Sequence, residues 1–283
     1  MNLKGINYWS YPGDPSLDDF FAKAKRDGFE AVEPAIGDEG ELHLDVTQSF
    51  CEDAVAKAES HGLKIMTMAS GTYWSYNLAS ADEADRTKAL TALKKMIRIT
   101  RWFGADTLLT IPGAVDIFFM PDTPVQPYDV VWARAVKGLQ EVLPVAADNK
   151  VSLGIENVWN KFLLSPMEMA HFIDSLESPW IGSYFDVGNI MPYGHPDQWI
   201  RILGDRVKAI HVKDFKRSVG TADGFVDLCE GDVPWDAVMA AIREIGYEGP
   251  LTAEMIPHYP SHAEVRCANT ANALSAIMGR RSM

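Results

Sequence analysis

The feature that most constrains the fold is an alternation of two patterns along the whole chain. Short runs rich in β-branched residues alternate eight times with longer stretches whose apolar residues recur at helical spacing. This alternation is typical of repeated βα units around a parallel sheet. The length of 283 residues is close to the roughly 250 residues of an eight-stranded α/β barrel. The sequence therefore predicts an α/β fold in which residues 1–283 form a single (β/α)8 TIM barrel domain.

The eight expected strands are short, and a helix follows each of them. Their approximate ranges are 3–8, 31–34, 64–69, 107–111, 151–156, 181–186, 206–214 and 251–254. The helix expected over 82–103 shows its pattern clearly, because Leu90, Leu93 and Ile97 form one apolar stripe. Proline lacks a backbone N–H, so Pro144 is expected to kink or interrupt the helix after the fourth strand.

Side chains that can bind a metal stand at the ends of the last four strands. Glu156 ends VSLGIE, Asp186 ends IGSYFD, and Glu254 ends PLTAE, while His211 lies near the end of RVKAIHVKD. The alternation of inward and outward residues along each strand allows all four side chains to point into one barrel mouth. The carboxyl ends of barrel strands are where such folds place their active sites. We therefore expect these four residues to form one site.

A metal ion is the simplest explanation for several carboxylates in a barrel interior. Without a cation they would repel one another and lose hydration. Three oxygen donors and one imidazole favour a hard or borderline divalent ion, with Mn²⁺ first, Mg²⁺ or Co²⁺ next, and Zn²⁺ compatible but less favoured. An ion with open positions could bind a carbonyl and its neighbouring hydroxyl and stabilise the enediolate formed between them. Aldose–ketose isomerisation and ketose epimerisation both use this chemistry.

The motifs around these residues resemble a known family. The segments GIENVWNKFLLSP, FDVGN, HVKDFKR, EGDVPW and LTAEM are similar to those of the xylose isomerase-like barrel superfamily, particularly its sugar and sugar-phosphate 3-epimerase branch. The resemblance implies that Glu156, Asp186, His211 and Glu254 bind the metal. It also implies that Glu156 and Glu254 are an acid/base pair that inverts C3 of a 2-ketose or ketose phosphate.

Further residues near the ligands are expected to contact the substrate. Arg217 follows His211 by six residues, a spacing that resembles the Arg of free-ketose 3-epimerases. Asn189 stands where those enzymes carry a His, and DVGN is more similar to the L-ribulose-5-phosphate 3-epimerase pattern. Lys213, Lys216 and Arg217 could neutralise a phosphate.

Carboxylate and aromatic side chains complete the expected substrate site. The alternation on the second strand turns Glu33 inward, opposite to Val32. Trp159 lies in an expected strand-end loop, as do Trp9, Trp74 and Phe118. Such rings could form an apolar wall against a sugar.

Four other functions compete with epimerisation. A hydroxypyruvate isomerase or an inosose dehydratase uses related enolate chemistry on the same fold. An AP endonuclease shares the barrel, but its three-metal site needs further histidines, whereas the third and fourth strands end in MASG and TIPG. A barrel that binds a sugar without converting it would have little use for two potential bases across a metal.

Composition and charge restrict the partners. A formal net charge of −13 repels nucleic acid and anionic membrane surfaces. No apolar run reaches the roughly 20 residues of a membrane span, and the first residues do not resemble a signal peptide, so we expect a cytoplasmic protein. Cys51, Cys229 and Cys267 are odd in number and widely spaced, which favours free thiols. The expected partner is a small sugar or sugar phosphate, and a homo-oligomer is compatible with the sequence.

Overall fold

Parallel strands form a closed ring at the centre of the molecule. The computed structural model describes residues 2–280, and its main sheet has the strand order β3-β5-β6-β7-β8-β9-β12-β1-β2-β4. These strands are β1 (Lys4–Asn7), β2 (Ala31–Glu33), β3 (Ala35–Ile36), β4 (Lys64–Ile65), β5 (Thr67–Ser70), β6 (Thr107–Thr110), β7 (Ser152–Glu156), β8 (Ile181–Asp186), β9 (Val207–Val212) and β12 (Leu251–Ala253).

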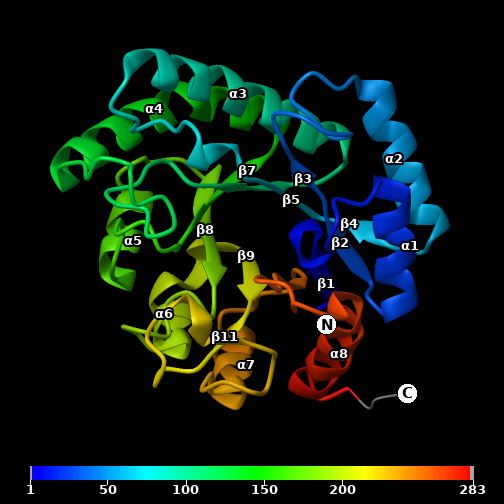
Figure 1. The fold of residues 1–283 in the computed structure, drawn as a ribbon. Coiled ribbons are helices and arrows are strands. Elements are labelled where there is room, and N and C mark those ends of the chain that lie inside the picture. Colours follow the sequence, from blue (N-terminus) through cyan, green and yellow to red (C-terminus); the bar gives the residue numbers. More distant parts are fainter. Residues whose placement is uncertain (1, 281–283) are drawn as a thin grey trace.

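The ring closes between the second and third strands of the barrel. Pro34 alone separates β2 from β3, and Met66 alone separates β4 from β5. Proline cannot donate a hydrogen bond to a strand ladder, which accounts for the break after β2. β2 and β3 together form the second strand of the barrel, and β4 and β5 together form the third. β2 pairs with β4 and β3 pairs with β5, both in parallel. The two ends of the sheet order, β3 and β4, therefore belong to neighbouring barrel strands, and the ring is closed. The predicted eight-stranded barrel is confirmed (Figure 1).

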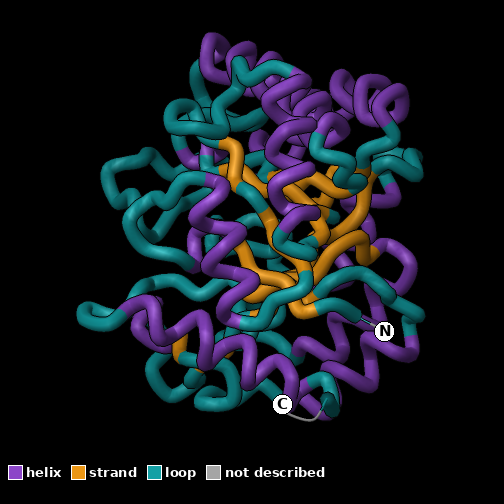
Figure 2. The backbone as a smooth tube through the Cα atoms, turned by 90° about the vertical axis from the view of Figure 1, so that its right-hand side faces the viewer, coloured by secondary structure: helices purple, strands orange, loops and turns teal. Residues whose placement is uncertain are grey.

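Within residues 2–280, eight α-helices surround this ring (Figures 1 and 2). They are α1 (Leu17–Asp27), α2 (Gln48–Ser60), α3 (Glu83–Trp102), α4 (Tyr128–Asn149), α5 (Pro166–Asp174), α6 (Pro196–Leu203), α7 (Trp235–Glu244) and α8 (Ala263–Ile277). In Figure 2 the strands lie inside a layer of helices and loops. Among the helices of residues 2–280, none has the length and apolar character that a membrane span requires.

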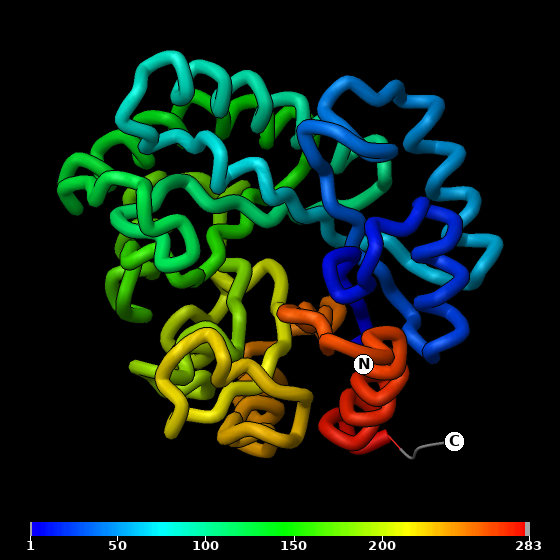
Figure 3. Tube along the Cα trace, viewed as in Figure 1, coloured from blue at the N-terminus to red at the C-terminus, as the bar shows by residue number. Residues whose placement is uncertain are grey.

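The first and last helices of the chain lie side by side, which brings the ends of the described chain together (Figure 3). Two polar contacts reinforce this closure. The Lys4 ammonium donates to Ser275 Oγ at 3.0 Å, and the Arg280 guanidinium donates to Glu30 Oε2 at 2.6 Å. The C-terminal helix is thereby tied to the first strand of the barrel.

The expected interruption at Pro144 is wrong. Helix α4 runs without a break from Tyr128 to Asn149 and contains Pro144. Pro144 and Gln140, whose carbonyl loses its helical partner, are both solvent-exposed. Water can satisfy that carbonyl, so the cost of the missing hydrogen bond is reduced at this position.

Strand β8 shows how the alternation of side chains divides core from site. Phe185 points outward, where its ring stacks on Trp199 of α6 at 6.0 Å between centroids. Tyr184 points inward, with its ring centroid 4.5 Å from that of His211. Both aromatic side chains are fully buried. The outward residue therefore holds a helix, and the inward residue supports the interior.

Replacing Phe185 with alanine tests this packing. Removing a buried aromatic ring leaves a cavity against Trp199, and we expect the free energy of unfolding to fall by about 3–5 kcal/mol. Urea unfolding followed by circular dichroism measures the change. As a control, Ile202→Ala on the exposed side of α6 should cost about 1 kcal/mol or less. Equal losses in the two variants would contradict the assigned direction of Phe185.

Candidate metal centre and substrate cavity

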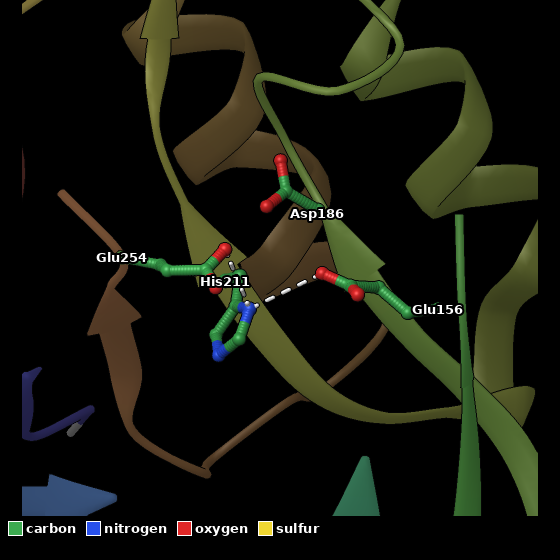
Figure 4. A group of neighbouring side chains, drawn as sticks. All are labelled: Glu156, Asp186, His211 and Glu254. Carbon is green, nitrogen blue, oxygen red and sulfur yellow. Dashed lines mark hydrogen bonds and ion pairs between the residues drawn. The ribbon is translucent and has the colours of Figure 1, made fainter. Parts of the chain in front are cut away.

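Four buried side chains meet at the carboxyl ends of neighbouring strands. Glu156, Asp186, His211 and Glu254 each offer one donor atom, and these atoms all lie within 4.8 Å of one another (Figure 4). Strand register accounts for the meeting, because Asp186 is paired with His211 across β8 and β9. The structure thus brings together the four residues that the sequence named.

The donor set fits a divalent cation. Asp186 Oδ2 is buried, and within residues 2–280 no group meets it in hydrogen-bond geometry, although the Lys213 ammonium lies 3.0 Å away. Buried carboxylates need cations beside them, and the Lys213 ammonium supplies one positive charge to a cluster that contains three carboxylates. Three carboxylates and one imidazole are the mixture that hard or borderline ions accept. Glu156, Asp186, His211 and Glu254 are therefore the residues that could hold a metal.

His211 lies between carboxylates on both sides of its ring. Its Nε2 is 2.7 Å from Glu33 Oε1, while its Nδ1 is 3.3 Å from Glu156 Oε1 and 3.7 Å from Glu254 Oε2. Burial alone would lower the pKa of His211, but the charge of Glu33 and the bonds to Glu156 and Glu33 raise that pKa well above its usual value. A proton on Nε2 is held by Glu33, so Nδ1 is the nitrogen that faces the metal site.

Glu156 has a pKa suited to moving a proton near neutral pH. Burial and the charge of Glu254 raise the pKa of Glu156, His211 and Lys213 lower it, and the net result is a pKa of about 7. A carboxyl group with a pKa near the working pH can both release and accept a proton.

Lys213 is a buried counter-charge for the same cluster. Its ammonium lies 3.0 Å from Asp186 Oδ2, contacts Glu254 Oε2, and lies 3.5 Å from Asn189 Oδ1. Burial lowers the pKa of Lys213, but the carboxylates of Asp186, Glu254 and Glu156 outweigh it and raise the pKa above its usual value. The ammonium is therefore charged and held at the site.

Glu33 does not take the substrate-contacting position that was expected. The residue has no exposed surface, and its carboxylate accepts hydrogen bonds from Asn7 Nδ2 at 2.6 Å, from the Tyr184 hydroxyl and from His211. These three groups occupy both carboxylate oxygens of Glu33, which lies beneath His211. Burial would raise the pKa of Glu33, but the charge of His211 and the hydrogen bonds lower it below its usual value. Glu33 orients the histidine and does not line the cavity.

Asn157 is a positioning residue that the sequence reasoning missed. Its side chain donates to the Asp186 carbonyl at 2.8 Å and accepts from the Asp186 N–H at 2.9 Å. Its own carbonyl accepts from Asn189 Nδ2 at 3.0 Å, and the Asn189 N–H donates to Asp186 Oδ1 at 2.8 Å. These bonds join the ends of β7 and β8. The available signal was a second polar residue directly after Glu156.

A cavity of about 520 Å³ opens above the cluster. Trp159, Asn189 and Lys213 line it, as do Glu156 and Glu254. The rest of the wall is largely apolar and comes from loops after several strands: Trp9, Gly71, Trp74, Leu109, Ile111, Phe118, Phe119, Val158, Ala222, Phe225, Ile256 and Pro257, together with Ser70. The expected aromatic wall is present, and the volume is in the usual range of ligand sites.

Arg217 lies outside this cavity, which corrects the expected substrate contact. The side chain is exposed, and its Nη2 donates to the Gly194 carbonyl at 3.1 Å. After β9 the chain forms an antiparallel pair of short strands, β10 (Asp214–Phe215) and β11 (Phe225–Val226). This hairpin carries Arg217 and the exposed Lys216 away from the cavity wall.

Comparison with known proteins agrees with this architecture. The sequence profile described as Xylose isomerase-like TIM barrel matches residues 21–274. The chain belongs to this family. A solved structure has the same fold over nearly the whole chain: D-psicose 3-epimerase, solved in the presence of D-fructose, superposes with a TM-score of 0.80 at 17% identity, covering 98% of this chain and 99% of that one.

Two curated relatives match over most of their length. SgbU of Escherichia coli (strain K12) is 28% identical over 257 residues, which cover 89% of this chain and 87% of SgbU. L-ribulose-5-phosphate 3-epimerase UlaE of Salmonella heidelberg (strain SL476) is 26% identical over 260 residues, which cover 91% of this chain and 87% of UlaE. Both relatives thus match this chain over nearly its whole length.

The metal-free protein should lose stability as pH rises from about 5 to 8. The pKa values of Glu156 and His211 are raised in the folded state, so their protonated forms stabilise the fold at low pH and that contribution is lost as each deprotonates. We expect the Tm to fall by about 5 °C across this range.

Added Mn²⁺ should raise the Tm more at pH 8 than at pH 5, because metal binding displaces these protons. Differential scanning fluorimetry with and without a chelator measures both effects. An E156Q variant should show a shallower slope in the metal-free state. A Tm that rises with pH in the chelated wild type would contradict the assignment.

Glu33→Gln tests the orienting role of the carboxylate behind His211. The change keeps the shape of the side chain and removes its charge, so we expect Mn²⁺ affinity to fall by about ten- to a hundredfold. Isothermal titration calorimetry measures the affinity. Glu59→Gln on the exposed side of α2 is the control and should bind the ion as the wild type does. Unchanged affinity in a folded Glu33→Gln protein would show that the carboxylate does not act through the histidine.

Proposed function

We propose that the protein is a divalent-metal-dependent isomerase that epimerises C3 of a 2-ketose or ketose phosphate. The observation that carries this proposal is the pair of buried glutamates that approach His211 from β7 and from the residue after β12 (Figure 4). Inversion at carbon needs one group to remove a proton and another to return a proton on the opposite face. Glu156 and Glu254 provide such a pair across one site.

The roles of the two glutamates follow from their surroundings. Glu156 lines the cavity, where its carboxylate can take or give a proton at C3. Glu254, whose carboxylate contacts the Lys213 ammonium, lines the same cavity and is the complementary group. Epimerisation is reversible, so each glutamate serves as base in one direction and as acid in the other.

The metal would be held by Glu156, Asp186, His211 and Glu254, with Mn²⁺ as the ion we propose first. When bound, a divalent ion supplies a Lewis acid that polarises the ketose carbonyl and offsets the negative charge left by proton removal. Glu33 and Asn157 keep His211 and Asp186 in the orientation that this requires.

Lys213, Asn189 and Trp159 are the proposed substrate contacts. All three line the cavity beside the glutamates. Lys213 can donate to the substrate oxygen on which charge develops, and Asn189 can hydrogen-bond a hydroxyl. The indole N–H of Trp159 donates to the Asn189 carbonyl at 2.7 Å. This bond leaves the faces of the Trp159 ring to pack against the sugar and exclude water.

The name of UlaE supports epimerisation at C3, because that relative is named for this reaction on a phosphorylated ketose. Its similarity extends over 91% of this chain, so the resemblance includes all the strands that carry the site. The four-residue cluster and the paired glutamates agree with that chemistry.

Glu254→Gln tests the proposal. The amide keeps an oxygen near the site but cannot take a proton, so we expect C3–H exchange with solvent deuterium to fall by about 10²–10⁴-fold. Proton NMR of the Mn²⁺-loaded protein with 2-ketoses measures the exchange. The control Glu264→Gln removes an exposed carboxylate on α8 and should exchange at the wild-type rate. Full exchange by folded, metal-loaded Glu254→Gln would falsify the proposed role.

A further inference from the structure

Aromatic rings form a connected wall on one side of the cavity. The Trp74 and Phe119 ring centroids lie 4.9 Å apart, Phe119 and Phe118 lie 5.2 Å apart, and Phe118 and Trp159 also lie 5.2 Å apart. The Trp159 ring continues to Phe225 at 5.1 Å. These rings come from four separate loops and line one cavity. The wall extends from the metal centre toward the outside.

The outer part of this wall is open to solvent. Phe118 is 49% exposed and Phe119 is 48% exposed, while Glu156 and Glu254 are buried at the inner end. Exposing two adjacent aromatic rings costs free energy in water unless another surface covers them. A ring of the substrate placed outward from the reacting carbons would cover them.

The charges of the cavity disfavour a phosphate group. Within residues 2–280, the charged side chains on the cavity wall are Glu156, Glu254 and Lys213. The Lys213 ammonium already bridges Asp186 and Glu254. A phosphate placed outward from the reacting carbons would lose its hydration against aromatic rings, and the cavity wall offers it no basic side chain there among the described residues. Lys216 and Arg217 lie on the exposed hairpin and not on the wall.

We propose that the substrate is an unphosphorylated keto sugar that carries a second ring on the end remote from the metal centre. This inference rests on the proposed epimerase function and names its substrate class. Sugar rings present C–H faces that pack on aromatic side chains. The cavity volume of about 520 Å³ is in the range that encloses drug-sized ligands, which leaves space for a ring beyond the reacting sugar.

Three probes with the same reacting carbons test the substrate class. D-fructose carries a hydroxyl at C6, D-fructose 6-phosphate carries a phosphate there, and isomaltulose carries a glucosyl ring on O6. Blocking O6 prevents the pyranose form in the last two probes, so their comparison isolates the substituent. We expect kcat/KM for C3–H exchange, measured by NMR with the Mn²⁺-loaded protein, to be at least about tenfold higher for isomaltulose than for D-fructose 6-phosphate.

The outcomes separate this inference from the epimerase proposal. Exchange on D-fructose 6-phosphate equal to or faster than exchange on isomaltulose would overturn the substrate class and leave the epimerase standing. If none of the probes exchanged, the epimerase proposal would fail for these sugars. Calorimetric binding to the metal-loaded protein then decides the substrate class by itself: tighter binding of isomaltulose supports it, and tighter binding of the phosphate overturns it.

A variant of the outer wall locates the second ring. Phe118→Ala should lower the isomaltulose to D-fructose 6-phosphate ratio of kcat/KM by about threefold or more, because it removes one ring from the wall. Leu164→Ala is the control, since Leu164 is similarly exposed at 47% but lies outside the cavity. A ratio that is the same in Phe118→Ala and Leu164→Ala would show that the aromatic wall does not hold the second ring.

Discussion

The balance of buried charge at the barrel mouth is the constraint on which the rest of the site depends. Glu33, Glu156, Asp186 and Glu254 bring four carboxylates into one buried region, and His211 and Lys213 bring two basic groups. If all six were ionised, two negative charges would remain uncompensated. The raised pKa of Glu156 shows one way in which the protein relieves that excess, and a divalent ion is another. The cluster therefore couples proton binding and metal binding.

The barrel tolerates this concentration of charge because the four carboxylates come from four different strands or strand ends. The outward residues of the same strands, such as Phe185 on β8, bury apolar surface against the helices. The inward residues are fixed by register, as in the pairing of Asp186 with His211. Below the cluster, the contacts of Tyr184 and Asn7 with Glu33 replace the water that this carboxylate loses. The fold thus supplies both the rigidity and the solvation that the site requires.

The sequence predicted which strand side chains point into the barrel. It predicted little about how deep those side chains lie or in which direction the loops carry theirs. The alternation of inward and outward residues along each strand placed the four cluster residues inside the barrel, and the structure brings them together. The same alternation predicted that Glu33 points inward, but it does not show how deep in the barrel a residue lies. In the structure, Glu33 lies below His211. Spacing along the chain suggested Arg217, yet the β10–β11 hairpin directs it outward. The expected interruption of the helix at Pro144 was wrong, because whether a proline in a helix is exposed depends on tertiary packing that the sequence does not show.

Lys213 connects the charge balance of the cluster to the chemistry of the cavity. Its ammonium contacts Asp186 Oδ2 and Glu254 Oε2, which are oxygens of the same residues that could hold the metal. A cation bound by those oxygens would weaken their attraction for the ammonium, because like charges repel at short range. The side chain also lines the cavity, so an ammonium released from the carboxylates can donate to Asn189 Oδ1, which lies 3.5 Å away, or to a substrate oxygen. Metal binding and substrate binding would then favour each other through one lysine.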